Sequence, residues 1–304
     1  NPDDSLMESC RKAEHLLGDN ALCTPSSNTM RQTAPSKFSV VFQLDDELHN
    51  FTIHVERNWA PSLADRFYNL ATHGFFHLQR FYRVVPGWVV QFGVSGSPEI
   101  SAVYDNRHNI PGAIVAEDPV RQSNVRGAVS FSAVYCHDED DVTKVRACNQ
   151  TTELFINLVD NSAVLDSKGF APFGIIEKED MSIVDEFIYQ GYGELEEICQ
   201  KGGTTNPTRS TVCKGPSEER LYLEGNKYLE KNFPKMSFTT SQIITNENRI
   251  NGGDRDGEQA FLVIVIIFVI GSIIIFVALV GSKISLRKRR QKLSPDALRE
   301  FELL

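Results

Sequence analysis

An arginine and a glutamine interrupt a stretch that is otherwise almost entirely apolar. The stretch is FYRVVPGWVVQFG, residues 81–93, and its polar members are Arg83 and Gln91. Its apolar side chains predict a buried strand, and a buried guanidinium needs either a partner or a chemical task. One such task is to donate hydrogen bonds, from a permanently charged and rigid group, to charge that develops during a reaction.

Rotation about a prolyl peptide bond needs such a donor but neither a nucleophile nor a metal. Its barrier, about 18–20 kcal/mol, arises because the nitrogen lone pair is delocalised into the carbonyl group. A catalyst therefore requires a pocket for the proline ring, contacts to the flanking chain and a donor aimed at the nitrogen. On spacing alone, a solvated strand arginine with a packed stem is the simpler interpretation of Arg83.

The elements that would position these side chains form a β-rich pattern. FSVVFQL and FTIHVE flank the turn DDELHN and predict a hairpin, and RGAVSFSAVY, TTELFINLV and FAPFGII are typical of strands. APSLADRFYNLATHG and MSIVDEFIYQGYG predict two amphipathic helices. Many strands with two helices favour a mainly β domain, a closed barrel, over residues 37–198.

Several of these blocks, in this order and spacing, resemble the cyclophilins, and in particular a divergent branch with QFG, DPVRQSN-RG and GFAPFG blocks. The similarity covers residues 38–194 and rests on FYRVVPGWVVQFG, DPVRQSNVRG, RGAVSFSA, TTELFINLVDNSAVLD and GFAPFG. The resemblance implies an eight-stranded barrel capped by two helices. It also implies peptidyl-prolyl cis-trans isomerase activity on proline-containing protein segments, without a cofactor.

The resemblance also assigns roles to individual residues. Arg83 matches the catalytic arginine, Gln91 the glutamine that positions the substrate backbone, and Phe155 the phenylalanine that floors the proline pocket. The other expected substrate contacts are Trp88, Ser132, Ala133, Glu153, Leu154, Val164 and Phe170.

Two polar departures from the family pattern lie near the expected site. Glu153 replaces the usual glutamine and adds a negative charge near Arg83. Ser132 and Ala133 replace a typical Ala-Asn pair whose backbone holds the peptide. These changes favour an alternative function, a catalytically weak cyclophilin-like structural or interaction subunit of a membrane complex.

The expected proline pocket departs from the pattern as well. Phe170 or Ala171 falls where many members have histidine, because an insertion near Val164 shifts the alignment by one residue. A tryptophan common near that insertion is absent. Cyclosporin binding is therefore expected to be weak.

The six cysteines all precede the apolar segment 260–282, and they predict disulfides in this part of the chain. Their spacing suggests three local pairs among fifteen connectivities, and six free thiols are the alternative. A pair at 136 and 148 would enclose the acidic insertion CHDEDDVTKVRAC, which could gate or occupy the substrate groove. The cysteines are Cys10, Cys23, Cys136, Cys148, Cys199 and Cys213.

Residues 260–282 contain no charge and are long enough, as a helix, to cross a hydrocarbon core of about 30 Å. The basic tail that follows, residues 283–304, predicts a single-pass membrane protein with this tail on the cytosolic side. The N-terminal part would then be lumenal or extracellular. The secretory pathway or cell surface is favoured by the cysteines, while an organelle inner membrane or thylakoid also fits.

Residues 1–36 are interpreted as an N-terminal segment and linker, and residues 199–259 as a stalk with a disulfide loop.

Other classes of site are less well supported. The net charge of −9 argues against nucleic-acid binding. His73 and His77 have helical metal spacing but lack a third ligand, so no metal is expected. Asn50 and Asn149 begin sequons and are candidates for glycosylation.

Overall fold

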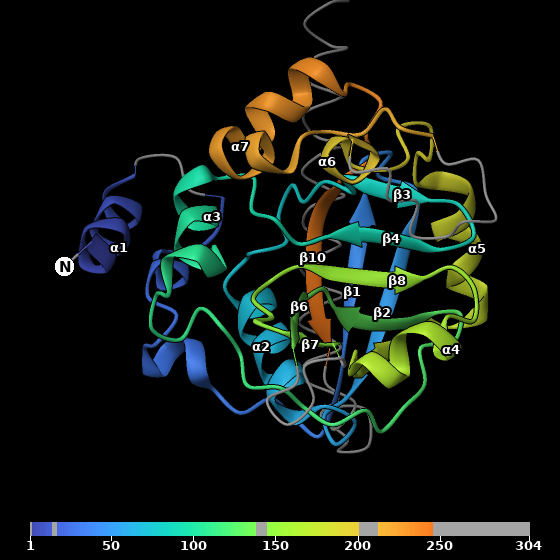
Figure 1. The fold of residues 1–304 in the computed structure, drawn as a ribbon, viewed down its shortest axis with the longest axis horizontal. Coiled ribbons are helices and arrows are strands. Elements are labelled where there is room, and N and C mark those ends of the chain that lie inside the picture. The colour runs from blue at the N-terminus through green and yellow to red at the C-terminus, as the bar shows by residue number, and fades with distance from the viewer. Residues whose placement is uncertain (1, 14–16, 138–144, 201–211, 246–304) are drawn as a thin grey trace, which may run out of the picture. The chain divides into compact units, whose positions relative to one another are not determined.

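The computed structural model describes residues 2–13, 17–137, 145–200 and 212–245, which belong to one compact unit. Its centre is an eight-stranded sheet in the order β10-β1-β2-β9-β5-β8-β4-β3 (Figure 1). The strands of this sheet are β1 (Lys37–Leu44), β2 (Asn50–Glu56), β3 (Arg83–Val85), β4 (Val89–Phe92), β5 (Ala128–Phe131), β8 (Leu154–Asn157), β9 (Pro172–Ile175) and β10 (Thr239–Thr245). A separate two-stranded sheet pairs β6 (Val134–His137) with β7 (Val145–Cys148).

The two ends of the strand order meet, so the sheet curls back on itself. Next to β3 and β10, the Phe81 amide donates to the Ser237 carbonyl at 3.1 Å, and the Thr239 amide donates to the Gln79 carbonyl at 2.9 Å. This curled sheet confirms the mainly β, barrel-like fold predicted from the sequence. The strand β10 lies in the segment interpreted as a stalk, yet it pairs antiparallel with β1 along most of its length.

Two of the helices match those predicted from the amphipathic pattern, α2 and α5. The α-helices are α1 (Pro2–Lys12), α2 (Pro61–Thr72), α3 (Pro98–Tyr104), α4 (Ser162–Leu165), α5 (Lys178–Phe187), α6 (Glu196–Gln200) and α7 (Glu218–Asn232). The described ranges also contain four short 3-10 helices: η1 (Asn20–Cys23), η2 (Asn28–Arg31), η3 (Asn106–His108) and η4 (Asp166–Lys168). Pro61 opens α2, where its missing amide hydrogen costs nothing.

Aromatic side chains fill the space between α2 and the sheet. Phe67 of α2 is fully buried, and its ring centroid lies 6.2 Å from that of Phe38 and 4.9 Å from that of Phe173. Aromatic rings at these distances bury large apolar areas and favour offset or tilted contacts. This packing fixes one face of the sheet as core and leaves the other for a site.

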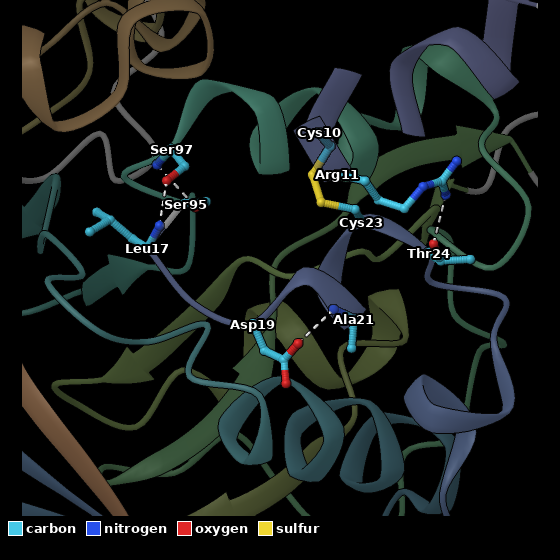
Figure 2. Close-up of a disulfide and its surroundings, with 9 residues drawn as sticks. All are labelled: Cys10, Arg11, Leu17, Asp19, Ala21, Cys23, Thr24, Ser95 and Ser97. Carbon is cyan, nitrogen blue, oxygen red and sulfur yellow. Dashed lines mark hydrogen bonds between the residues drawn. A yellow bond between two sulfur atoms is a disulfide. The ribbon is translucent and has the colours of Figure 1, made fainter. Parts of the chain in front are cut away.

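The N-terminal segment is docked onto the domain. Cys10 of α1 and Cys23 of η1 form a disulfide with a Cα–Cα distance of 5.5 Å, and both residues are fully buried (Figure 2). In the same view, the Leu17 amide donates to the Ser97 hydroxyl at 2.8 Å, just before α3 begins. The part of the chain interpreted as an N-terminal segment and linker is therefore packed against the domain.

None of the helices in the described ranges has both the length and the apolar character needed to cross a bilayer. The apolar segment 260–282 and the tail 283–304 lie outside the described residues.

Candidate active site

Three neighbouring strands bring the expected catalytic residues into one row. In the ladders, Arg83 of β3 stands opposite Gln91 of β4, and Gln91 stands opposite Phe155 of β8. Successive side chains on a strand point to opposite faces, so the row lies on the face away from the core residues Val84 and Val90. The backbone register alone therefore assembles the arginine, the glutamine and the phenylalanine.

The Arg83 guanidinium is buried and has specific partners. Only 7% of Arg83 is exposed. Its Nε and Nη2 atoms both donate to the carboxylate of Glu194, with Nη2 at 2.8 Å from Oε2, and Glu194 is fully buried. The remaining Nη1 donates to Gln91 Oε1 at 3.0 Å. A two-point ion pair of this kind compensates the cost of removing both charges from water.

A backbone ladder beside β3 places Glu194 at this position. The Val84 amide donates to the Gly193 carbonyl at 3.2 Å, and the Glu194 amide donates to the Val212 carbonyl at 2.8 Å. The disulfide between Cys199 and Cys213, with a Cα–Cα distance of 6.0 Å, ties the two sides of this ladder together. A Cβ atom on Gly193 would lie only 2.0 Å from the Val212 carbonyl oxygen, so this close approach requires glycine.

Gln91 links the arginine to a second carboxylate. Its Nε2 donates to Glu153 Oε2 at 2.8 Å and to the Ser132 hydroxyl at 3.2 Å. Glu153 also accepts hydrogen bonds from the hydroxyls of Tyr82 and Tyr222, the latter at 2.5 Å. The charge introduced by Glu153 is therefore stabilised by three donors, and Gln91 is held in one orientation by hydrogen bonds at both ends of its amide.

Burial, and after it the negative charge of Glu153, raises the pKa of the Tyr82 phenol well above its usual range. The folded protein keeps this proton at a pH where an unfolded tyrosine, with a pKa of about 10, has lost it. This contribution to stability is complete below pH 10 and is lost as the pH rises towards the folded-state pKa. We therefore expect Tyr82 alone to lower the free energy of unfolding above pH 10 by about 1.4 kcal/mol per pH unit, and Tyr222 and Tyr104, whose pKa values burial also raises, to add to this fall.

Urea unfolding between pH 8 and pH 11 measures this slope. The Tyr82→Phe variant should show a shallower slope, whereas Tyr135→Phe, at a position that is 53% exposed, should keep that of the wild type. Equal slopes for wild type and Tyr82→Phe would contradict the assignment.

The expected proline pocket is assembled and filled. Phe155, Trp88 and Phe170 are only 6%, 9% and 5% exposed, and the Phe155 and Phe170 ring centroids are 5.7 Å apart. Phe170 therefore packs in the pocket cluster, whereas Ala171 packs in the core of the domain. The residues of this apolar cluster are Val85, Trp88, Val89, Ala147, Phe155, Leu165 and Phe170, with Ala133 packed against them.

Two expected substrate contacts lie elsewhere. Leu154 is fully buried in the core of the domain because it precedes Phe155 on β8 and must point to the opposite face. Val164 is 42% exposed, and its neighbour Leu165 packs in the pocket cluster instead.

A cavity of about 330 Å³ adjoins this row on the side of Gln91. Ser132, Ala133 and Glu153 line it together with Gln91, and Tyr222 of α7 also contributes. The part of the cavity wall that Tyr222 forms therefore comes from beyond residues 38–194, the segment that resembles the family. Their helices, α6 and α7, lie on the side of the sheet where β3 forms its edge (Figure 1).

The structure also shows where most of the other residues proposed from the sequence lie. All six cysteines pair as their spacing suggested, and the Cα–Cα distance between Cys136 and Cys148 is 5.9 Å. His73 Nδ1 lies 3.2 Å from the Asp19 carboxylate and His77 Nδ1 lies 2.9 Å from the Thr240 carbonyl, and the described part of the chain holds no cluster of metal ligands. Glycosylation of Asn50 and Asn149, both exposed, stays a prediction.

Reasoning from sequence missed Glu194, Tyr82, Tyr222 and Ala147. Arg83 and Glu194 are separated by 111 positions, and Glu153 and Tyr222 by 69. Ala147 has no charged or reactive group that would have suggested a role in the site. The requirement that a buried arginine have a partner was the only available indication of Glu194.

Comparisons with known proteins identify a family and similar crystal structures. The family model of the cyclophilin type peptidyl-prolyl cis-trans isomerases matches residues 39–192. Two crystal structures of a cyclophilin type peptidyl-prolyl cis-trans isomerase from Cryptosporidium parvum, one in the presence of the dipeptide Ala-Pro, are similar to this chain. Each has 10% sequence identity and covers 69% of this chain and 99% of its own, with TM-scores of 0.41 and 0.40.

Proposed function

Because this chain belongs to the cyclophilin-type peptidyl-prolyl cis-trans isomerase family, we propose that it accelerates X-Pro rotation in partner proteins from a membrane anchor. The observation that carries the proposal is the row formed by Arg83, Gln91 and Phe155 across three adjacent strands. Phe155 would support the proline ring, and Gln91 would hold the substrate backbone. Arg83 would donate a hydrogen bond to the prolyl nitrogen as its conjugation with the carbonyl is lost.

The anchor and the compartment are parts of this proposal that rest on sequence. The charge-free segment 260–282 has the length of a membrane helix, and the basic residues that follow it favour a cytosolic-side tail. Three disulfides in the domain fit an oxidising compartment, a lumen or the cell exterior.

The filled proline pocket favours a second function. With Phe155 and Trp88 covered and Arg83 paired, the domain would serve as a structural or interaction subunit of a membrane complex. The two functions differ in whether the site ever accepts a proline-containing segment.

A proline-isomerisation assay on the full chain tests the proposal. Wild type should accelerate cis-trans exchange of an Ala-Pro peptide, and Arg83→Lys, which keeps the charge but loses the forked donors, should lower kcat/KM about 100-fold. The matched control is Arg80→Lys, because Arg80 is another buried arginine, 8% exposed, paired with Glu230 at 3.0 Å. Exchange at the uncatalysed rate, in wild type and in every variant of the site, would favour the structural subunit.

A further inference from the structure

We propose that a cavity between α2, η2 and residues 112–116 binds a small organic anion, whose carboxylate or phosphate group pairs with Arg66 and Arg31. This cavity shares no residue with the catalytic row or with the cavity beside Gln91, so it is a separate site. The proposal rests on three features: a buried cation without an anionic partner, a cavity beside it, and a second cation that lines the same cavity.

Arg66 is the one buried arginine in the described ranges that forms no ion pair. Of the other two, Arg80 pairs with Glu230 and Arg83 with Glu194. Arg66 lies on α2 and is only 8% exposed. A buried charge normally has an opposite charge beside it, because its removal from water is otherwise costly. The described residues therefore supply a counter-charge for Arg80 and Arg83 but not for Arg66.

The groups that contact the Arg66 guanidinium are neutral. Its Nη2 donates to the Gly112 carbonyl, and its Nη1 is buried without an acceptor among the described residues. The guanidinium carbon lies 5.5 Å from the ring centroid of Tyr104. Burial raises the pKa of Tyr104 to about 12, so this phenol is uncharged at neutral pH and cannot balance the positive charge.

The acidic residue next to Arg66 in the chain, Asp65, is already paired. Its carboxylate accepts from Arg57 Nε at 2.6 Å and from Arg57 Nη2 at 2.8 Å, and it also accepts from the Ala34 amide at 2.8 Å. Asp65 lines the cavity too, but the guanidinium of Arg57 balances its charge. The partner of Arg66 must therefore come from elsewhere.

A cavity of about 290 Å³ lies beside Arg66. Ser62 and Asn69 line it from the same face of α2 as Arg66, because residues three or four positions apart lie on one side of a helix. Met30 and Ile114 contribute apolar wall. The volume is close to the lower limit of ligand pockets, about 300 Å³, so it suits a small organic molecule with one charged end.

A second guanidinium lines the same cavity. Arg31 of η2 is exposed and forms no ion pair with a described residue. Burial lowers the pKa of Arg66, and the like charge of Arg31 lowers it further. Two cations beside one cavity repel each other unless an anion lies between them. A guanidinium donates two parallel hydrogen bonds to a carboxylate or a phosphate, so these are the charged groups that the cavity would accept.

Isothermal titration calorimetry of the full chain, at constant ionic strength, tests the site with phenyl phosphate, benzoate and inorganic phosphate. At least one aromatic anion should bind, and the tighter of the two identifies phosphate or carboxylate as the preferred group. Inorganic phosphate should bind more weakly than phenyl phosphate, because it lacks an apolar body. No binding of any probe would overturn the site, and equal affinity for the two phosphates would overturn its assignment to an organic anion.

Three substitutions of arginine locate the binding. Arg66→Met removes the charge but keeps much of the side-chain volume, and it should weaken binding of the tighter probe about 100-fold. Arg31→Gln, at an exposed position, should fold normally and weaken binding about fivefold. Arg121→Gln is the matched control and should bind as the wild type does, because Arg121 is exposed, donates to the Asn58 carbonyl and lies outside the cavity.

Thermal unfolding gives a second readout. The probe should raise the Tm of wild type and of Arg121→Gln, because it binds the folded chain. Without the probe, Arg66→Met should be at least as stable as wild type, since it removes a buried charge that lacks a partner. Unchanged affinity in Arg31→Gln, or an equal rise of Tm in Arg66→Met and wild type, would overturn the site. None of these measurements uses isomerase activity, so this site and the proposed function can fail independently.

Discussion

Replacing Glu194 with alanine is expected to lower the free energy of unfolding by about 3–5 kcal/mol, the cost of leaving a buried charge without its partner. The two-point bond to Arg83 is the most buried ion pair in the described part of the chain, with side-chain exposures of 9% and 1%. Gln91, which donates to Glu153 and accepts from Arg83, cannot supply a second carboxylate. Urea unfolding at neutral pH measures the loss.

A double variant without either charge separates the charge effect from simple loss of packing. Arg83→Met combined with Glu194→Leu removes both charges and fills similar volumes, so most of the lost stability should return. The exposed pair of Lys12 and Glu8 provides the contrast, since Glu8→Ala should leave stability almost unchanged. If the Glu194→Ala cost is that small, or if the double variant is as unstable as the single one, the buried pair does not stabilise the domain as argued.

The part of the fold that could be predicted is the part encoded by local patterns. Alternation in FSVVFQL and FTIHVE predicted β1 and β2, and the apolar spacing of Leu63, Phe67 and Leu70 predicted α2. The row of Arg83, Gln91 and Phe155 was predicted from the resemblance of whole blocks, because several motifs in order constrain register far better than one. Leu154 was misplaced only because a block match does not say which face a residue occupies.

The parts that could not be predicted depend on contacts between distant segments. Glu194 lies in GYGELEE, where nothing distinguishes it from the glutamates that follow, and only the ladder beside β3 turns it towards Arg83. The strand β10, with the sequence TTSQIIT, is half-exposed and set in a polar region. Five of its seven residues are the β-branched Thr and Ile, which favour strands, but its pairing with β1 joins segments that lie far apart in the sequence and is not visible in a local pattern.

A chain ending at residue 198, the domain boundary that the sequence suggests, is expected not to fold cooperatively, whereas a chain ending at residue 247 should do so. The shorter chain lacks β10, which covers the edge of β1, and lacks α7. It also lacks four buried side chains that pack in one cluster with Tyr82: Leu221, Tyr228, Leu229 and Met236. At about 1.5–3 kcal/mol for each buried side chain, their loss is comparable to the whole stability of a typical domain, about 5–15 kcal/mol.

Circular dichroism during urea unfolding distinguishes the two chains, because only a cooperative domain gives a sigmoidal transition. Within the longer chain, Leu229→Ala, at a position that is 1% exposed, should cost about 2–5 kcal/mol. Leu223→Ala, on the same helix but 65% exposed, should stay within about 0.5 kcal/mol of wild type. A sigmoidal transition in the chain ending at residue 198 would show instead that the domain folds without α7 and β10.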